Sequence, residues 1–140
     1  MRQVHMSEAD QITDLLKNSK TIAVVGLSEN RMRAAYGVSA YMQSQGYRII
    51  PVNSEATEVL GEKAYPSLTA IPEPVDIVDI FRRSEFVGSI VDDAIQKGAK
   101  AVWMQETVVN DEAAQKAREK GMFVVMDRCI LKEHRKRSKS

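Results

Sequence analysis

The residues with the clearest chemical potential lie in one loop, within residues 21–33 (TIAVVGLSENRMR). Gly26 ends a short apolar run and allows the chain to turn tightly there. Ser28, Arg33 and the first backbone N–H groups of a following helix can together hold a diphosphate, since helix N-termini bind anions and arginine pairs with phosphate oxygens. The same residues also fit a solvated turn with two surface arginines, and this alternative stays open.

Further candidate binding residues lie at the end of each later apolar run. The positions at these run ends are Pro51 and Asn53, then Phe81, Arg82 and Arg83, then Gln105 and Glu106, and finally Asp127, Arg128 and Cys129. The two consecutive arginines would add positive charge suited to a further phosphate, although Arg83 fits an ordinary surface residue equally well. Asn53 can bond a ribose or the edge of a base.

The loop does not carry a complete dinucleotide fingerprint. The second and third glycines of that fingerprint are missing, which leaves less room for the backbone to approach a dinucleotide pyrophosphate. The run that ends at Asn53 also lacks the Asp or Glu that accepts the ribose hydroxyls in NAD-binding proteins. Both departures disfavour an NAD(P)-binding protein, which remains an alternative.

The sequence shows no recognisable catalytic set. The two histidines, His5 and His134, lie near the termini, and neither metal-ligand spacing nor a nucleophile elbow occurs. Cys129 is a candidate thiolate, because Arg128 is adjacent and a helix is expected to begin there. Simple packing is the alternative for this cysteine. Asp79, inside an apolar run, is predicted to be hydrogen-bonded within the fold rather than catalytic.

Five near-continuous apolar runs predict strands that are covered on both faces. They are Thr21–Val25 and residues 47–53, 75–80, 99–105 and 122–128. Helical patterns connect them, and three of these patterns end at a glycine just before the next run, as is typical of helix ends.

The predicted helices cover residues 7–18, 35–45, 85–97 and 111–120. Ser7 is the expected N-cap of the first, and Ser84 and Asn110 are the expected N-caps of the last two. The link over residues 53–74 is predicted to hold at most one short helix, because glycine and prolines interrupt it.

Alternation of strands and helices predicts an α/β fold, a doubly wound sheet of five mainly parallel strands with helices on both faces, in a single domain over residues 1–140. Right-handed crossovers place the carboxyl end of every strand on the same edge of the sheet. Ligands of such sheets bind at that edge, near the point where the strand order reverses. The candidate residues of separate runs are therefore expected to meet.

Composition limits the classes of protein that remain. The 140 residues suit one domain, and no apolar run approaches the roughly 20 residues that a membrane span needs. A single cysteine and the lack of a signal-peptide core favour a cytoplasmic location. The net charge of +1 is uneven, since residues 132–140 form a basic tail and the rest is slightly acidic. Such a body has no general attraction for nucleic acid, and the tail is expected to be a solvated, partly disordered end.

Several motifs occur together over residues 21–134, namely TIAVVGLS, GYRIIPVN, AYPSL, VDIVDIFRR, AVWMQ and VVMDRCI, the last followed by Glu133-His134. In this order and spacing they resemble the small stand-alone CoA-binding proteins with a Rossmann-like fold. That family is related to the N-terminal domain of the succinyl-CoA synthetase α subunit. The chain departs from its pattern at Ser54, where proline is common, and at Arg31 and Ala34, where the loop often carries prolines.

The resemblance implies that coenzyme A lies across the strand ends. The residues at the matching positions are Gly26, Leu27, Ser28 and Arg33 for the phosphates, Pro51 and Asn53 for the adenosine side, Phe81 and Arg82 for the other wall, and Gln105 for the approach to pantetheine.

The leading hypothesis is a cytoplasmic protein that binds CoA or an acyl-CoA without catalysing a reaction, and a homo-oligomer is compatible with it. One alternative is a subunit of an NDP-forming acyl-CoA synthetase, which would need a partner chain carrying the phosphorylated histidine. Another is a mixed disulfide between Cys129 and CoA. Nucleic-acid binding through the basic tail is the weakest alternative.

Overall fold

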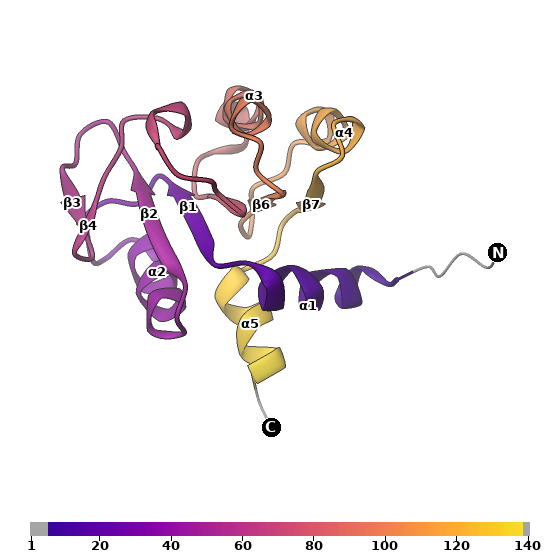
Figure 1. Cartoon of the computed structure of the whole chain (residues 1–140), viewed down its shortest axis with the longest axis horizontal. Coiled ribbons are helices and arrows are strands. Elements are labelled where there is room, and N and C mark those ends of the chain that lie inside the picture. Colours follow the sequence, from indigo (N-terminus) through magenta and orange to yellow (C-terminus); the bar gives the residue numbers. More distant parts are fainter. Residues whose placement is uncertain (1–5, 139–140) are drawn as a thin grey trace.

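The computed structural model describes residues 6–138 and contains one parallel sheet of five strands (Figure 1). The strands are β1 (Thr21–Val25), β2 (Arg48–Val52), β5 (Ile77–Ile80), β6 (Ala101–Met104) and β7 (Phe123–Val125). Their order in the sheet is β2-β1-β5-β6-β7, and every neighbouring pair is parallel. The predicted α/β class and the five strands are confirmed.

Helices cover both faces of the sheet, as predicted. The helices are α1 (Glu8–Asn18), α2 (Ala34–Ser44), α3 (Val87–Lys97), α4 (Asp111–Glu119) and α5 (Ile130–Ser138). Figure 1 shows α3 and α4 on one side of the sheet and α1, α2 and α5 on the other. Each side has its own buried apolar cluster, and near-continuous Val, Ile and Ala in the strands supply both clusters.

Two of the predicted N-caps are confirmed and one is wrong. Ser7 accepts a hydrogen bond from the Asp10 N–H (3.1 Å), and Asn110 accepts one from the Ala113 N–H (2.9 Å). Ser84 does not cap α3, because a 3₁₀ turn over Ser84–Phe86 (η2) precedes that helix. Its hydroxyl instead accepts from the Val109 N–H (3.0 Å) and ties two loops of the sheet edge together.

The link between β2 and β5 contains more structure than predicted. A hairpin of two very short strands, β3 (Glu58–Val59) and β4 (Glu62–Lys63), turns at Leu60 and Gly61, both of which have positive φ. One 3₁₀ turn, Leu68–Ala70 (η1), follows. A parallel bridge between Val52 and Tyr65 then ties this link to the edge strand β2.

The basic tail is helical rather than disordered over residues 132–138, although Lys132, Arg135 and Lys136 are exposed to solvent as expected. These residues belong to α5, and the Arg137 guanidinium donates to the Glu133 carboxylate (3.1 Å), the Ala9 carbonyl (3.0 Å) and the Thr13 hydroxyl (2.7 Å). The arginine therefore fastens α5 to α1. Residues 139–140 of the tail, and His5, lie outside the described residues.

The strand order fixes where a ligand site can form. β1 has β2 on one side and β5 on the other, so the chain leaves β1 and β5 in opposite directions at the same edge. A crevice forms at such a switch point. None of the helices within residues 6–138 is long and apolar enough to cross a membrane.

Candidate functional site

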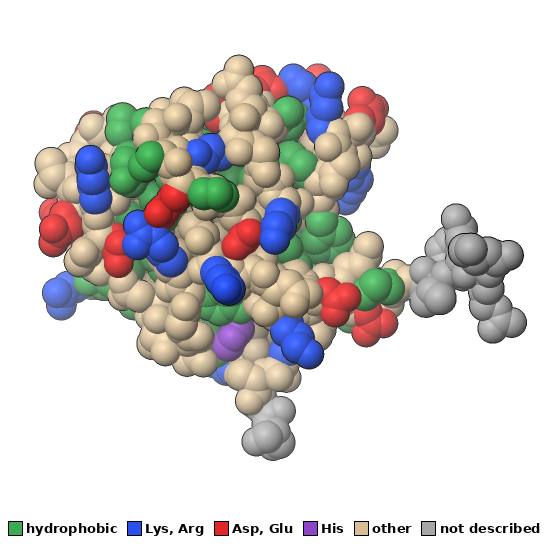
Figure 2. Space-filling model, viewed as in Figure 1, with side chains coloured by type: hydrophobic (Ala, Val, Ile, Leu, Met, Phe, Trp, Pro, Cys, Tyr) green, Lys and Arg blue, Asp and Glu red, His purple; other side chains and the backbone are tan. Residues whose placement is uncertain are grey.

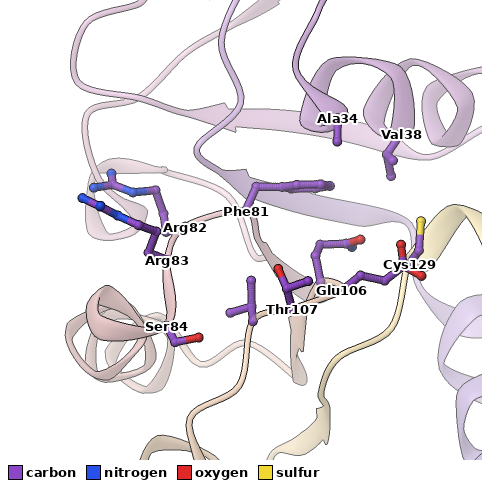
Figure 3. A pocket seen from close by; sticks show the side chains of 11 residues that line it. Ala34, Val38, Phe81, Arg82, Arg83, Ser84, Glu106, Thr107 and Cys129 are labelled. Atoms are coloured by element: carbon purple, nitrogen blue, oxygen red, sulfur yellow. The ribbon is translucent and has the colours of Figure 1, made fainter.

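Two adjoining cavities lie over the carboxyl ends of the strands. Cavity A, of about 860 Å³, is bounded by the loops after β1, β2 and β5. Cavity B, of about 670 Å³, is bounded by the loops after β5 and β6, the start of α2 and the residue before α5 (Figure 3). Both are lined by Phe81, Arg82 and Arg83, so they form one cleft that crosses the switch point.

Gly26 allows the loop after β1 to lie close to the ends of β2 and β5, and the shape of cavity A depends on this contact. It has a φ of +99°, and a Cβ at this position would lie 2.9 Å from the Phe81 carbonyl oxygen. Its N–H donates to the Val52 carbonyl (3.1 Å), while the Phe81 N–H donates to the Val25 carbonyl (2.9 Å). Only glycine allows the loop to pass this close to the end of β5.

The rest of the loop after β1 is held by its own short polar side chains. The Asn30 N–H donates to the Ser28 hydroxyl oxygen (3.2 Å), and the Met32 N–H donates to the Asn30 side-chain oxygen (3.0 Å). The Ser28 hydroxyl keeps its own proton for donation to a ligand. The loop is therefore shaped before a ligand arrives.

The start of α2 is electropositive and lies between the two cavities. Arg33 is the N-cap residue without a side-chain capping bond, and the first turn has no acidic residue. Arg33 lines cavity A, and Ala34 lines cavity B. The helix dipole and the guanidinium thus both favour an anion at this point.

Cavity A has an excess of positive charge. Three arginines line it, against Glu55 as the one carboxylate among its described lining residues. Within residues 6–138, Arg33 and Arg82 have no acidic partner, whereas Arg83 lies 3.6 Å from Glu85. The Arg82 guanidinium lies 4.6 Å from the centre of the Phe86 ring, which holds it at the rim.

Asn53 joins the loops that form the floor of cavity A. Its side-chain N–H donates to the Leu27 carbonyl (3.1 Å), and its side-chain oxygen accepts from the Glu55 N–H (2.8 Å). Each amide atom of Asn53 therefore has only part of its hydrogen-bonding capacity left for a ligand.

Cavity B has a more apolar wall. Figure 3 shows the Phe81 ring reaching toward Ala34 and Val38 of α2, with the two arginines at one end of the view and Cys129 at the other. The Glu106 carboxylate is paired with Lys132 (2.9 Å). Thr107 and Asp127 both have positive φ, and the Thr107 N–H donates to the Asp127 carboxylate (2.7 Å), which fixes the rim.

A buried polar pair lies beneath cavity B. Asp79 is 1% exposed and Gln105 is 4% exposed, and the Gln105 side-chain N–H donates to the Asp79 carboxylate. Burial raises the pKa of the Asp79 carboxyl to about 7. The prediction that Asp79 is hydrogen-bonded within the fold is confirmed.

Comparisons with known proteins identify the family. The family described as "CoA binding domain" matches residues 20–135. The chain belongs to this family. It is 46% identical over 124 residues to the uncharacterized protein YneT of Bacillus subtilis, covering 89% of this chain and 92% of YneT.

Solved structures of similar proteins agree with this CoA-binding-domain fold. A hypothetical protein from Pyrococcus horikoshii OT3 superposes with a TM-score of 0.90 at 38% identity, covering 97% of this chain and 98% of that one. The structure of cell-free ID.343 from Thermus thermophilus gives a TM-score of 0.88 at 34% identity, covering 93% and 98%. A shorter match reaches the Pyrococcus furiosus acetate–CoA ligase [ADP-forming] II subunit alpha, 36% identical over 64% of this chain but only 20% of that subunit.

Most of the predicted binding residues of this CoA-binding domain come together in the cleft. Those that line cavity A are Gly26, Ser28, Arg33, Asn53, Phe81 and Arg82. Gln105 lines cavity B. Leu27 is fully buried beneath the loop, and Pro51 lies inside β2 opposite Val24, so neither lines a cavity. Their side chains support the loop and the strand.

The sequence patterns missed part of the wall of cavity B. Val38, Thr107 and Val108 line it but follow no motif that distinguishes them from core or loop residues. Val38 lies one turn after Ala34 in α2, and this helical spacing was the one available signal. Cys129 lines the same cavity, while the Arg128 guanidinium pairs with Glu8 of α1 (2.7 Å).

Proposed function

We propose that this CoA-binding domain binds coenzyme A or an acyl-CoA as a non-catalytic binding protein. The phosphates would occupy cavity A, and the pantetheine arm would run through cavity B. The observation that carries the proposal is one continuous cleft at the switch point, electropositive at one end and more apolar at the other. A CoA molecule has the same division, with three phosphate groups at one end and a neutral arm at the other.

The charge pattern favours CoA over a dinucleotide. Arg33, Arg82 and Arg83 are distributed around cavity A, which suits phosphates at more than one position. At the tip of β2, Asn53 occupies the position where an NAD-binding sheet offers a carboxylate to the ribose. A ligand with an additional phosphate in place of a second nucleoside fits these groups better.

Two further observations concern the acyl-CoA synthetase alternative and the nucleic-acid alternative. His134 lies away from the cleft, where its Nδ1 is hydrogen-bonded to the Tyr41 hydroxyl (2.9 Å) and its ring meets Tyr47 edge-on. On the face shown in Figure 2, lysine and arginine are interspersed with aspartate and glutamate, which does not favour nucleic acid.

Isothermal titration of the purified chain with CoA, NAD and ATP tests the proposal. We expect CoA to bind with one site per chain and with higher affinity than NAD or ATP. Tighter binding of NAD than of CoA would overturn the proposal and restore the dinucleotide alternative.

A second candidate function is a subunit of an acyl-CoA synthetase. The partial similarity to an ADP-forming acetate–CoA ligase subunit favours it. Under this proposal the chain acts with a partner that carries the phosphorylated histidine and binds nucleotide. Co-purification with an ATP-grasp protein supports this candidate, and purification of the endogenous chain without such a partner counts against it.

We further propose that Cys129 can form a mixed disulfide with CoA bound in the cleft. Because its thiol lines the cavity proposed for the arm, oxidation with diamide in the presence of CoA should join the two sulfurs. Diamide takes up the two electrons and two protons that the thiols lose. The mass should increase by one CoA, Cys129→Ser should abolish the increase, and Arg33→Ala should slow it by weakening the complex. A wild-type chain that binds CoA but forms no adduct contradicts this option.

A further inference from the structure

The Asp79–Gln105 pair lies in apolar surroundings, where burial of a carboxyl group costs free energy of desolvation. Asp79 is in the middle of β5, beside Val24 of β1 and Trp103 of β6, both fully buried. Gln105 is the one side chain within residues 6–138 that hydrogen-bonds to this carboxyl. An apolar residue would pack in such surroundings without a desolvation penalty. Packing therefore does not explain the carboxyl group at this position, which indicates that it has another role.

Gln105 connects this carboxyl to the cleft. It follows β6 directly, its N–H donates to the Ile80 carbonyl (3.3 Å), and its side chain lines cavity B. A glutamine amide can turn either its NH₂ group or its oxygen toward a ligand. Here the Nε2 donates to Asp79, so within the described residues Oε1 is the amide atom left without a protein partner.

An ionised carboxylate accepts hydrogen bonds and donates none. Asp79 in that form is compatible with only one orientation of the Gln105 amide, the one with Nε2 inward and Oε1 toward the cavity. The pantetheine arm contains secondary amides, whose N–H groups need an acceptor once they leave water.

We propose that Asp79 is a positioning residue for ligand selection, which fixes Gln105 Oε1 as the acceptor for an amide N–H of the bound arm. The inference rests on the proposed binding of CoA. Under it, cavity B selects ligands that carry a secondary amide over nucleotides that lack the arm. Asp79 itself does not touch the ligand.

The test compares two ligands, CoA and adenosine 3′,5′-bisphosphate, which is the nucleotide end without the arm. Calorimetric titrations run at pH 8, above the pKa of Asp79 of about 7. The variants are Asp79→Val, Gln105→Met and their double variant, with Asp79→Asn to restore a buried acceptor. Ile77→Val is the matched control, because Ile77 lies on the same face of β5 and is fully buried.

Asp79→Val and Gln105→Met should each weaken CoA binding about 3- to 10-fold, the usual effect of one neutral hydrogen bond. The double variant should bind CoA no more weakly than Gln105→Met alone, since both changes remove the same contact. Asp79→Asn should bind CoA with an affinity between those of Asp79→Val and the wild type, because its amide can either accept from Gln105 Nε2 or donate to Gln105 Oε1. Ile77→Val should bind CoA like the wild type. The affinity for the bisphosphate should stay constant throughout.

The inference is overturned if Asp79→Val binds CoA like the wild type, or if the bisphosphate loses affinity by the same factor as CoA. Thermal melts establish that each variant is folded before titration. A wild-type chain that binds neither ligand refutes the proposed function itself, which is a different outcome from unchanged CoA affinity in the Asp79 variants.

Discussion

The two ends of the cleft are built on different physical principles. Cavity A presents exposed arginines and the start of α2 on a loop held by its own side chains. Cavity B presents Phe81, Val38 and a buried amide, drawn from segments far apart in the chain. Charge at cavity A would supply most of the affinity and its salt dependence, while shape and one fixed acceptor at cavity B would supply selectivity.

The largest effect on CoA binding should come from a substitution at Gly26, where the loop after β1 passes the end of β5. Gly26→Ala forces a side chain into a positive-φ position 2.9 Å from the Phe81 carbonyl. We expect CoA binding to fall at least about 100-fold, because the loop must move away from β5, and stability to fall by about 1–3 kcal/mol. Calorimetry and thermal melts measure both quantities.

Gly37→Ala is the matched control, since Gly37 lies in α2 and a Cβ there meets nothing within 4 Å. This substitution should leave CoA binding intact and raise stability by about 0.5–1 kcal/mol. Equal loss of binding in the two glycine variants would contradict the assigned role of Gly26.

A smaller effect is expected from the arginines of cavity A. Arg33→Ala and Arg82→Ala should each weaken CoA and the bisphosphate alike, by about 10- to 100-fold, because each removes a charge-assisted hydrogen bond. The losses should shrink at high salt. Arg118→Ala is the control, because Arg118 is exposed on α4 away from the cleft, and it should change neither affinity. If the arginine variants lost affinity for CoA but not for the bisphosphate, charge would not dominate binding in cavity A.

A substitution that fills cavity B should affect the affinity for CoA and the affinity for the bisphosphate differently. Val38→Phe places a ring where the arm would lie beside Phe81, and should weaken CoA about tenfold while the bisphosphate binds as before. Parallel titrations of the two ligands measure the ratio. If the bisphosphate is weakened as much as CoA, the two cavities do not hold separate halves of the ligand.

The smallest effect on binding, and a clear one on stability, is expected from Asp79→Asn. The folded-state pKa of about 7 lies above the unfolded value of 3.8, so the folded chain holds this proton over a range in which the unfolded chain has lost it. Stability therefore falls as the pH rises from about 4 to about 7. Thermal melts should show Asp79→Asn more stable than the wild type at pH 8, with the difference vanishing near pH 4. A difference that does not depend on pH would contradict the raised pKa.

Local sequence predicts some of these features and not others. The strands and the turn at Gly26 were predictable because apolar runs and a terminal glycine are contiguous signals. The role of Ser84 was not, because its hydroxyl is bonded to Val109, which approaches only when β5 and β6 pair. The β3–β4 hairpin is too short to show alternation.

The candidate site shows the same contrast. The residues of cavity A lie within one loop and two strand ends, and most were predicted. The wall of cavity B forms only when α2, β6 and the segment before α5 come together. Thr107 therefore carries no signal of its own, and the only signal for Val38 is its helical spacing from Ala34. Arg137 likewise bonds to Ala9 and Thr13 of α1, which lies far away in the sequence.

The central claim is that one ligand spans both cavities, with its phosphates in cavity A. Backbone amide NMR shifts measured with the bisphosphate and then with CoA test it directly. The bisphosphate should shift the amides of residues 26–34 and 81–83, and CoA should shift these and also Gln105, Thr107 and Cys129. Bisphosphate-induced shifts centred on Gln105 and Cys129, or CoA-induced shifts confined to other parts of the molecule, would contradict the account.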